Sequence, residues 1–277
     1  MIKPNFLVLT TINPINSSIK KLIEQTDFNL IIVGDKKTPN YPQGNFEFLD
    51  IYKQKILPLK SIETCPYNSY QRKNIGYLYA ISKGAEIIAE TDDDNYPLSD
   101  WAKNIEFTPK KTKLVLEPKI FNVYTEFTKE KIWPRGFPLE LILENKEKKI
   151  TQIQNPLVGI WQGLVNNEPD VDAIYRLTLN KTINFSKNEP IVLSKGVFCP
   201  FNSQNTIWKK EFFPYMYLPI SVTFRMTDIL RGYVAQRCLW EHESFLGFTG
   251  PTMIQERNPH NLIEDFKPSS VCFFNTG

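Results

Sequence analysis

Residues 86–95 are Glu-Ile-Ile-Ala-Glu-Thr-Asp-Asp-Asp-Asn, a short apolar segment that runs directly into three consecutive aspartates. An isoleucine-rich segment of this length is typical of a buried β-strand. Three adjacent carboxylates repel one another unless a cation lies among them. Because side chains alternate along an extended chain, we expect Asp92 and Asp94 to point to the same side. Their oxygen atoms suit Mg²⁺ or Mn²⁺, so this stretch predicts a metal site at a strand end, with a solvated acidic turn as the alternative.

The hundred residues around this stretch alternate between strand and helix. Apolar segments predict strands at residues 6–11, 30–33, 46–49 and 86–91. Capping residues predict one helix from Asn16, Ser17 or Ser18 to about Gln25, and another from Asn68 or Ser69 to about Gly84. This alternation predicts an α/β fold of Rossmann type, with a mixed, mainly parallel sheet flanked by helices.

Three loops of this half are expected to meet, because ligands of such sheets collect at the carboxyl ends of the strands. The loops are residues 10–13, 34–37 and 92–95. They supply Thr11, Asn13 and Asp93 as candidate ligand-binding residues. They also supply Asp35, which suits a nucleobase N–H, and Lys36, which suits a phosphate. A plain polar turn is the alternative for residues 34–37.

The segment Arg72-Lys73-Asn74 begins the predicted helix that precedes the acidic strand. Cations and backbone amides at a helix start attract phosphate. We therefore expect Arg72 and Lys73 to bind a phosphate and Asn74 to bind a base or ribose oxygen. An ordinary exposed helix end is the alternative.

The second half, residues 101–277, has a less regular pattern. It predicts a strand at residues 114–116, a solvated loop at 146–149, and a helix from Asp228 to about Trp240 with Thr227 as its N-cap. Without a flexible linker or repeat, the chain is expected to form one domain. Residues 1–100 would form a nucleotide-binding half, and residues 101–277 would bind a second substrate, the acceptor.

Several residues of the second half are candidates for chemistry. Arg135, between Trp133 and Phe137, suits a sugar or a phosphate, or else a packed loop. A carboxylate at a helix N-terminus suits a general base, which makes Asp228 the first candidate. Asp170 and Asp172 are the rival candidates for the general base. Alternatively, these two carboxylates bind the acceptor. His260 is a candidate third metal ligand, although a lone histidine is more often structural.

The composition excludes several classes of protein. The 277 residues carry a net charge of only +3, which does not indicate binding to nucleic acid. The four cysteines are far apart and predict free thiols. Because neither a signal peptide nor a membrane-length apolar run is evident, we expect a cytoplasmic protein. The sequence is also compatible with peripheral membrane contact.

Four blocks, at residues 8–14, 33–39, 70–77 and 91–95, resemble the STELLO-type glycosyltransferases in sequence and spacing. The resemblance continues through residues 135–138 and 257–260. We expect this chain to lack the membrane anchor and the extra C-terminal domain of the plant members, and therefore do not expect a Golgi location. A weaker resemblance is to the reversibly glycosylated polypeptides, which include UDP-arabinopyranose mutases. They share a triple aspartate, an Arg-Gly-aromatic-Pro segment and an acidic residue that opens a late helix.

These resemblances imply a GT-A fold, a divalent metal, Mn²⁺ or Mg²⁺, and a nucleotide-sugar donor, with UDP-sugars favoured. The expected function is transfer of a sugar to a carbohydrate or other hydroxyl acceptor. The alternatives are a sugar-nucleotide mutase, a nucleotidyltransferase and a non-catalytic scaffold. A nucleotidyltransferase usually has a glycine-rich first loop, which residues 10–18 lack.

Overall fold

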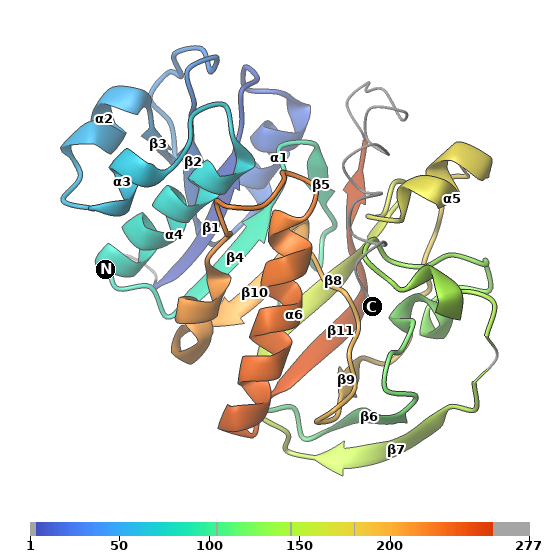
Figure 1. Ribbon diagram of the computed structural model, residues 1–277. Coiled ribbons are helices and arrows are strands. Elements are labelled where there is room, and N and C mark those ends of the chain that lie inside the picture. The colour runs from blue at the N-terminus through green and yellow to red at the C-terminus, as the bar shows by residue number, and fades with distance from the viewer. Residues whose placement is uncertain (1–3, 104, 145, 180, 257–277) are drawn as a thin grey trace.

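The computed structural model describes residues 4–256 except 104, 145 and 180. Within these residues all strands join one eleven-stranded sheet (Figure 1). The strands are β1 (Asn5–Thr10), β2 (Asn29–Val33), β3 (Glu47–Leu49), β4 (Ile87–Thr91), β5 (Asn95–Pro97), β6 (Lys111–Glu117), β7 (Lys149–Gln154), β8 (Val158–Asn166), β9 (Ile191–Leu193), β10 (Asn205–Lys209) and β11 (Phe245–Gln255).

The α-helices are α1 (Ser17–Gln25), α2 (Ile51–Ile56), α3 (Ser61–Thr64), α4 (Lys73–Ser82), α5 (Ala173–Thr178) and α6 (Thr227–Leu239). Shorter 3-10 helices are η1 (Tyr70–Arg72), η2 (Val123–Glu126), η3 (Leu139–Leu141), η4 (Lys210–Met216) and η5 (Trp240–His242). Figure 1 shows α4 and α6 on the same face of the sheet.

The strand order is β3-β2-β1-β4-β10-β8-β11-β9-β6-β7, and β5 pairs with β11. Strands β1 to β4 are parallel to one another. Strand β10 is antiparallel to both β4 and β8, and β11 is parallel to β8. Strands β8 and β11 therefore run in the same direction as β1 to β4, and all six end at one edge of the sheet. The predicted α/β fold with a mixed sheet flanked by helices is confirmed.

Alternating side chains of the parallel strands enter two separate cores. Val8 and Ile31 belong to the core that contains Ile75 of α4. Leu7 and Leu9 belong to the core that contains Ile19 and Leu22 of α1. Because a strand points successive side chains to opposite faces, helices on both faces are needed to bury these continuous apolar segments.

The helix boundaries follow local capping, with two differences from the prediction. Asn16 caps α1 by accepting a hydrogen bond from the Ile19 amide. Ser69 caps the 3-10 turn η1, so α4 begins only at Lys73. The prediction that Thr227 is an N-cap is wrong, because Thr227 lies inside α6 and its hydroxyl donates to the Pro219 carbonyl at 2.8 Å.

The central strands of the second half were missed by the sequence pattern. Strand β8 is buried along almost its whole length, but its nine residues include Gln162 and two glycines. Strand β11 contains Gly247, Gly250 and Pro251 and has register shifts around Pro251. Such residues weaken the local strand signal, so pairing with neighbouring strands determines both elements.

Gly76 allows α4 to lie directly on the sheet. A Cβ atom at this position would lie 2.5 Å from Val8 Cγ1 and 2.7 Å from Val33 Cγ2. Both valines are fully buried in the core beneath the helix. The close approach therefore depends on the missing side chain.

We expect Gly76→Ala to lower the free energy of unfolding by about 1–3 kcal/mol, because the added methyl group overpacks the helix–sheet contact. Thermal and urea unfolding measure the change. Ser82→Ala, at an exposed position of the same helix, is the matched control and is expected to change stability little. Equal melting temperatures for the two variants would contradict the close packing.

Candidate functional site

A cleft of about 410 Å³ opens at the edge where β1, β2 and β4 end. The expected convergence of the three loops is confirmed, because residues 10–13, Asp35 and residues 92–94 all line it. The second half of the chain closes the opposite side. Its lining residues are Arg135, Asp170, Gln204, Phe224, Arg225, Asp228 and Gln255.

The acidic run itself forms a turn between β4 and β5, in which the Asn95 amide donates to the Asp92 carbonyl at 3.4 Å. The alternation of an extended strand therefore does not apply to Asp92 and Asp94, contrary to the expectation. Each of the three carboxylates instead meets a different set of partners. The turn presents all three aspartates to the cleft.

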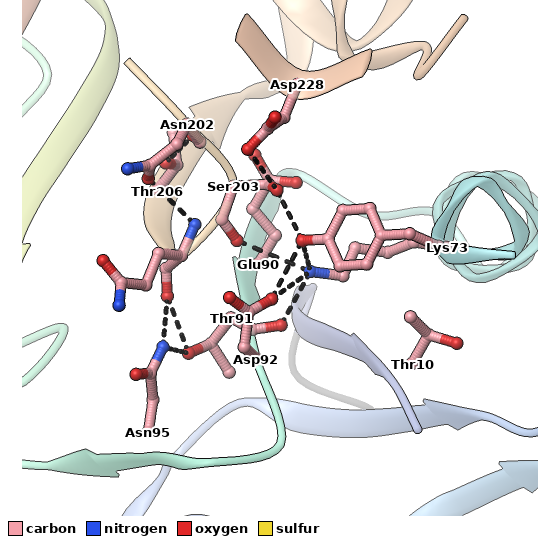
Figure 2. A network of polar contacts seen from close by, with 12 residues as sticks. Thr10, Lys73, Glu90, Thr91, Asp92, Asn95, Asn202, Ser203, Thr206 and Asp228 are labelled. Atoms are coloured by element: carbon pink, nitrogen blue, oxygen red, sulfur yellow. Dashed lines mark hydrogen bonds and ion pairs between the residues drawn. The ribbon is translucent and has the colours of Figure 1, made fainter. Parts of the chain in front are cut away.

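Asp92 is joined to the buried ammonium group of Lys73 (Figure 2). Lys73 Nζ lies 3.2 Å from Asp92 Oδ1 and also donates to the Thr91 carbonyl at 2.7 Å. The Tyr70 hydroxyl donates to the same Asp92 oxygen at 2.9 Å. Burial raises the pKa of the Asp92 carboxyl above its ordinary value, although Lys73 and Tyr70 act in the opposite direction. A further cation near Asp92 would favour its ionised form.

Asp93 connects the acidic run to the loop after β1. Its Oδ2 accepts hydrogen bonds from the Thr11 hydroxyl and, at 2.8 Å, from Asn13 Nδ2. Its backbone carbonyl accepts from Asn16 Nδ2 at 2.7 Å. Thr11 and Asn13 therefore hold the acidic turn against the loop after β1 in the cleft, and Asn16 holds it against the start of α1. Asp94 Oδ1 accepts from Gln255 Nε2 at 3.0 Å, which joins the turn to the end of β11.

The predicted phosphate-binding role of the helix start does not fit where the structure places Arg72 and Asn74. Arg72 is fully buried outside the cleft, where it donates to Gln54 and to the Cys65 carbonyl and lies against the Tyr67 ring. Asn74 exchanges two hydrogen bonds with the backbone of Leu218. Neither ligand binding nor the alternative of an exposed helix end describes these two side chains, because both are buried where the 3-10 turn η1 precedes α4 and the segment after η4 packs against it. Lys73 alone of the three contacts a cleft residue.

The loop after β2 contributes Asp35 but not Lys36. Asp35 is 5% exposed, lines the cleft, and accepts from the Ser69 amide at 3.1 Å. Lys36 is exposed and its ammonium group lies 4.2 Å from the centre of the Tyr67 ring, outside the residues that line the cleft. Of these two residues, only Asp35 is placed to contact a ligand in the cleft.

Arg135 lies between two carboxylates on the other side of the cleft. Its Nε and Nη2 donate to Asp170 at 2.8 Å each, and Nη2 also donates to Asp228 Oδ2 at 2.9 Å. The two aspartates raise the pKa of Arg135 well above its ordinary value, although burial acts to lower it. The guanidinium group is thus a fixed bridge between residues far apart in the sequence, where it was expected to meet a sugar or a phosphate.

Asp228 occupies the first turn of α6 and is 6% exposed. Its Oδ1 accepts from Arg135 and from the Ile229 amide, which occupies both lone pairs of that oxygen. Its Oδ2 accepts from Arg135 and, at the longer distance of 3.4 Å, from the Ser203 hydroxyl. A ligand hydroxyl can therefore displace the weak Ser203 contact and donate a hydrogen bond to Oδ2.

Another predicted site residue, Asp172, lies outside the cleft. Asp172 is 2% exposed and is the N-cap of α5, where it accepts from the Ile174 amide at 2.8 Å. Of the two rival carboxylates, Asp170 and Asp172, only Asp170 lines the cleft. His260 lies outside the described residues.

Tyr70, Ser203, Gln204 and Gln255 contribute to the cleft or its support without having been predicted. Figure 2 shows Ser203 between the acidic strand and Asp228. Tyr70 shares a hydrogen bond with Ser203 and donates another to Asp92, and so connects the two sides. A single sequence offers little signal for these residues, because only the antiparallel pairing of β10 with β4 brings residues 203 and 204 to this edge.

Beneath the cleft, Glu90 of β4 forms an ion pair with Arg231 of α6. Arg231 Nη1 lies 2.8 Å from Glu90 Oε1, and both side chains are inaccessible to solvent or nearly so. Tyr77 donates to Glu90 Oε2 and Trp208 donates to Oε1 at 2.9 Å. Both carboxylate oxygens are thus satisfied, which makes burial of the pair tolerable.

The carboxylate oxygens of the acidic turn determine whether the cleft can hold a metal ion. Among the described residues, no three or more His, Cys, Asp or Glu side chains are grouped as a metal-binding cluster. Magnesium, however, is usually held by one or two carboxylates, with substrate phosphates and water as the remaining ligands. Asp92 Oδ2 and Asp93 Oδ1 have no hydrogen-bond partner among the described residues. The oxygen-rich turn therefore fits a hard cation that is shared with a phosphate.

The fold and site define an α/β protein whose acidic cleft lies at the carboxyl ends of its strands. Comparison with known proteins identifies its relatives. The chain is 32% identical to Probable glycosyltransferase STELLO1 of Arabidopsis thaliana over 254 residues, which cover 84% of this chain and 33% of that protein. It is 30% identical to Probable glycosyltransferase STELLO2 of Arabidopsis thaliana over 268 residues, which cover 90% of this chain and 35% of that protein.

These matches confirm the resemblance to STELLO-type proteins over most of the chain, which spans about a third of the length of both curated relatives. No protein-family model matches. A solved structure titled "Crystal Structure of a Mycobacterial Protein" aligns with 96% of this chain and 70% of that chain, with a TM-score of 0.44 and 9% identity. Among the described residues, none of the helices is long and apolar enough to cross a membrane.

We expect Glu90→Gln to lower the free energy of unfolding by about 3–5 kcal/mol, because it leaves the buried Arg231 charge without its counterion. Chemical denaturation measures the change. Glu86→Gln is the control: its ion pair with Lys210 is more than half exposed, so we expect a loss of at most about 1 kcal/mol. Similar losses of unfolding free energy for both variants would show that burial does not make the Glu90 pair more important for stability than the exposed pair.

Proposed function

We propose that the chain is a metal-dependent glycosyltransferase of GT-A type that transfers a sugar from a nucleoside-diphosphate sugar to a hydroxyl acceptor. The observation that carries the proposal is one cleft that contains Asp92, Asp93 and Asp94 on one side and the Arg135–Asp228 pair on the other. The printed names of the two curated relatives support the same activity.

The nucleoside of the sugar donor is assigned to the side of the cleft formed by the loops after β1 and β2. There Thr11, Asn13 and Asp35 line the cleft, and Asp35 is a buried acceptor that suits a nucleobase N–H. The diphosphate is assigned to the acidic turn. Asp92 and Asp94 would hold Mn²⁺ or Mg²⁺, and Asp93, whose Oδ2 keeps the turn in place through Thr11 and Asn13, would present its Oδ1 to the same cation. The metal would supply positive charge for the departing diphosphate.

Asp228 is assigned as the general base. The acceptor oxygen forms a bond to the anomeric carbon of the sugar, the bond from that carbon to the diphosphate breaks, and the acceptor proton passes to Asp228 Oδ2. Arg135 holds this carboxylate in position through two hydrogen bonds. Attack from the face opposite the leaving group would invert the configuration. A carbohydrate acceptor and a cytoplasmic location complete the proposal.

We expect a nucleoside diphosphate to raise the melting temperature only when Mn²⁺ is present, because a ligand that binds the folded state stabilises it. A thermal-shift screen of UDP, GDP, ADP and their sugar derivatives, with and without Mn²⁺, measures this. In Asp94→Asn the metal-dependent shift should disappear, while the control Asp100→Asn, at an exposed ion pair, should keep it. An unchanged shift in Asp94→Asn would remove Asp94 from the metal site.

With the sugar donor found in that screen, we expect Asp228→Asn to bind the donor normally but to release nucleoside diphosphate about 10²–10⁴-fold more slowly, because the general base is lost. Water serves as the acceptor in this assay. Asp172→Asn, whose side chain only caps α5, should retain the rate. Full activity of Asp228→Asn would place the base elsewhere, and conversion of the sugar without net release would favour a mutase.

A further inference from the structure

A second cavity of about 550 Å³ lies along α4, between this helix, α3 and the chain from η4 to Ile220. Ile75, Leu78 and Ile81 line it from α4, and Phe213 and Met216 line it from η4. We call this cavity the α4 groove. Its volume is in the range of small-molecule sites, roughly 300–1,000 Å³. Nothing in the proposed sugar transfer uses it.

The α4 groove is long as well as apolar. Residues that line it extend from Asn74 at the start of α4 to Gly84 and Ala85 beyond its end. Ten residues of helix correspond to a length of about 15 Å, at about 1.5 Å per residue. Its rim includes two of the exposed apolar side chains of the chain, Ile81 at 41% and Ile220 at 38% exposure. Leaving such side chains in water is unfavourable, and an apolar ligand would cover them.

The α4 groove is separate from the candidate active site. The two hydrogen bonds between the Asn74 side chain and the Leu218 backbone, at 2.9 and 2.8 Å, join its two walls at the end nearest Lys73. Asn74 lines the groove, whereas the cleft is lined by none of the α4 residues. A ligand in the groove therefore need not be the sugar donor or its acceptor.

The α4 groove has few polar groups, and these limit the classes of ligand that it can bind. Lys210 supplies the one formal charge among the described residues that line it, and its side chain is 56% exposed. Its ammonium group forms an ion pair with Glu86, which lies outside the groove lining, and its remaining N–H donors can bind a second carboxylate. Inside, the buried Ser61 Oγ has no hydrogen-bond partner. A strongly polar ligand would lose its hydration against the apolar walls without compensating hydrogen bonds. A hydrocarbon chain matches these walls, and an anionic head matches Lys210.

We propose that the α4 groove binds a single-chain anionic amphiphile, of the fatty-acid class, with its hydrocarbon chain along α4 and its carboxylate beside Lys210. The site is independent of the sugar transfer proposed above. Affinity is expected to depend on chain length, because each methylene buried against Leu78, Ile81 and Met216 adds to the favourable transfer from water.

The test is isothermal titration of the full chain with monomeric dodecanoate and with butanoate. We expect one dodecanoate per chain and at least hundredfold weaker binding of butanoate. Binding of both acids with equal affinity would overturn the proposal. So would binding to phospholipid vesicles without binding of monomeric dodecanoate, because that result would indicate a surface contact instead of an enclosed site.

Three variants locate the site. Ile81→Glu should weaken dodecanoate binding at least tenfold, because it places a negative charge at the apolar rim. Leu230→Glu is the matched control, since Leu230 is also on a helix and is 38% exposed but lies outside the α4 groove. Lys210→Gln should weaken binding of dodecanoate but not of dodecan-1-ol. Equal affinities for the Ile81 and Leu230 variants, or an unchanged preference for the acid in Lys210→Gln, would refute this assignment.

Discussion

The ion pair between Glu90 and Arg231 is the interaction on which the candidate site depends. Glu90 precedes the acidic turn by one residue, Thr91, and Arg231 lies on α6 one turn after Asp228. The 2.8 Å contact therefore fixes the strand that carries the metal candidates against the helix that carries the candidate base. Because both charges are inaccessible to water, neither can move away without a large desolvation cost. This coupling sets the relative position of the two sides of the cleft.

The direction of the strands explains why one edge collects so many functional groups. Strands β8 and β11 belong to the second half of the chain but run in the same direction as β1 to β4. Their ends therefore bring Gln255 to the acidic turn and the loop containing Asp170 to the same cleft. Strand β10 runs in the opposite direction. The residues just before its start, Ser203 and Gln204, therefore lie at this edge of the sheet. A cleft with contributions from both halves is the result.

Much of the first half could be predicted, because its signals are local. The apolar segments of β1, β2 and β4 and the cap at Asn16 need no distant partner to be recognised. The convergence of Thr11, Asp35 and the acidic run followed from the general geometry of parallel sheets. The roles of Arg72 and Asn74 could not be predicted in the same way. Their surroundings are made by Gln54 and Leu218, which are distant in the sequence.

The sequence by itself determined the alternation of strands and helices, the position of three aspartates at a strand end, and the edge where they meet their neighbouring loops. These properties depend on side-chain periodicity and on backbone capping over a few residues. Only the tertiary structure decided which polar groups face the cleft. It turned Arg135 into a bridge between Asp170 and Asp228, assigned Asp172 to the cap of α5, and buried Lys73 beneath Asp92. The physical reason is that a buried charge must find an opposite charge or a hydrogen bond, and packing over long sequence distances determines which partner is within reach.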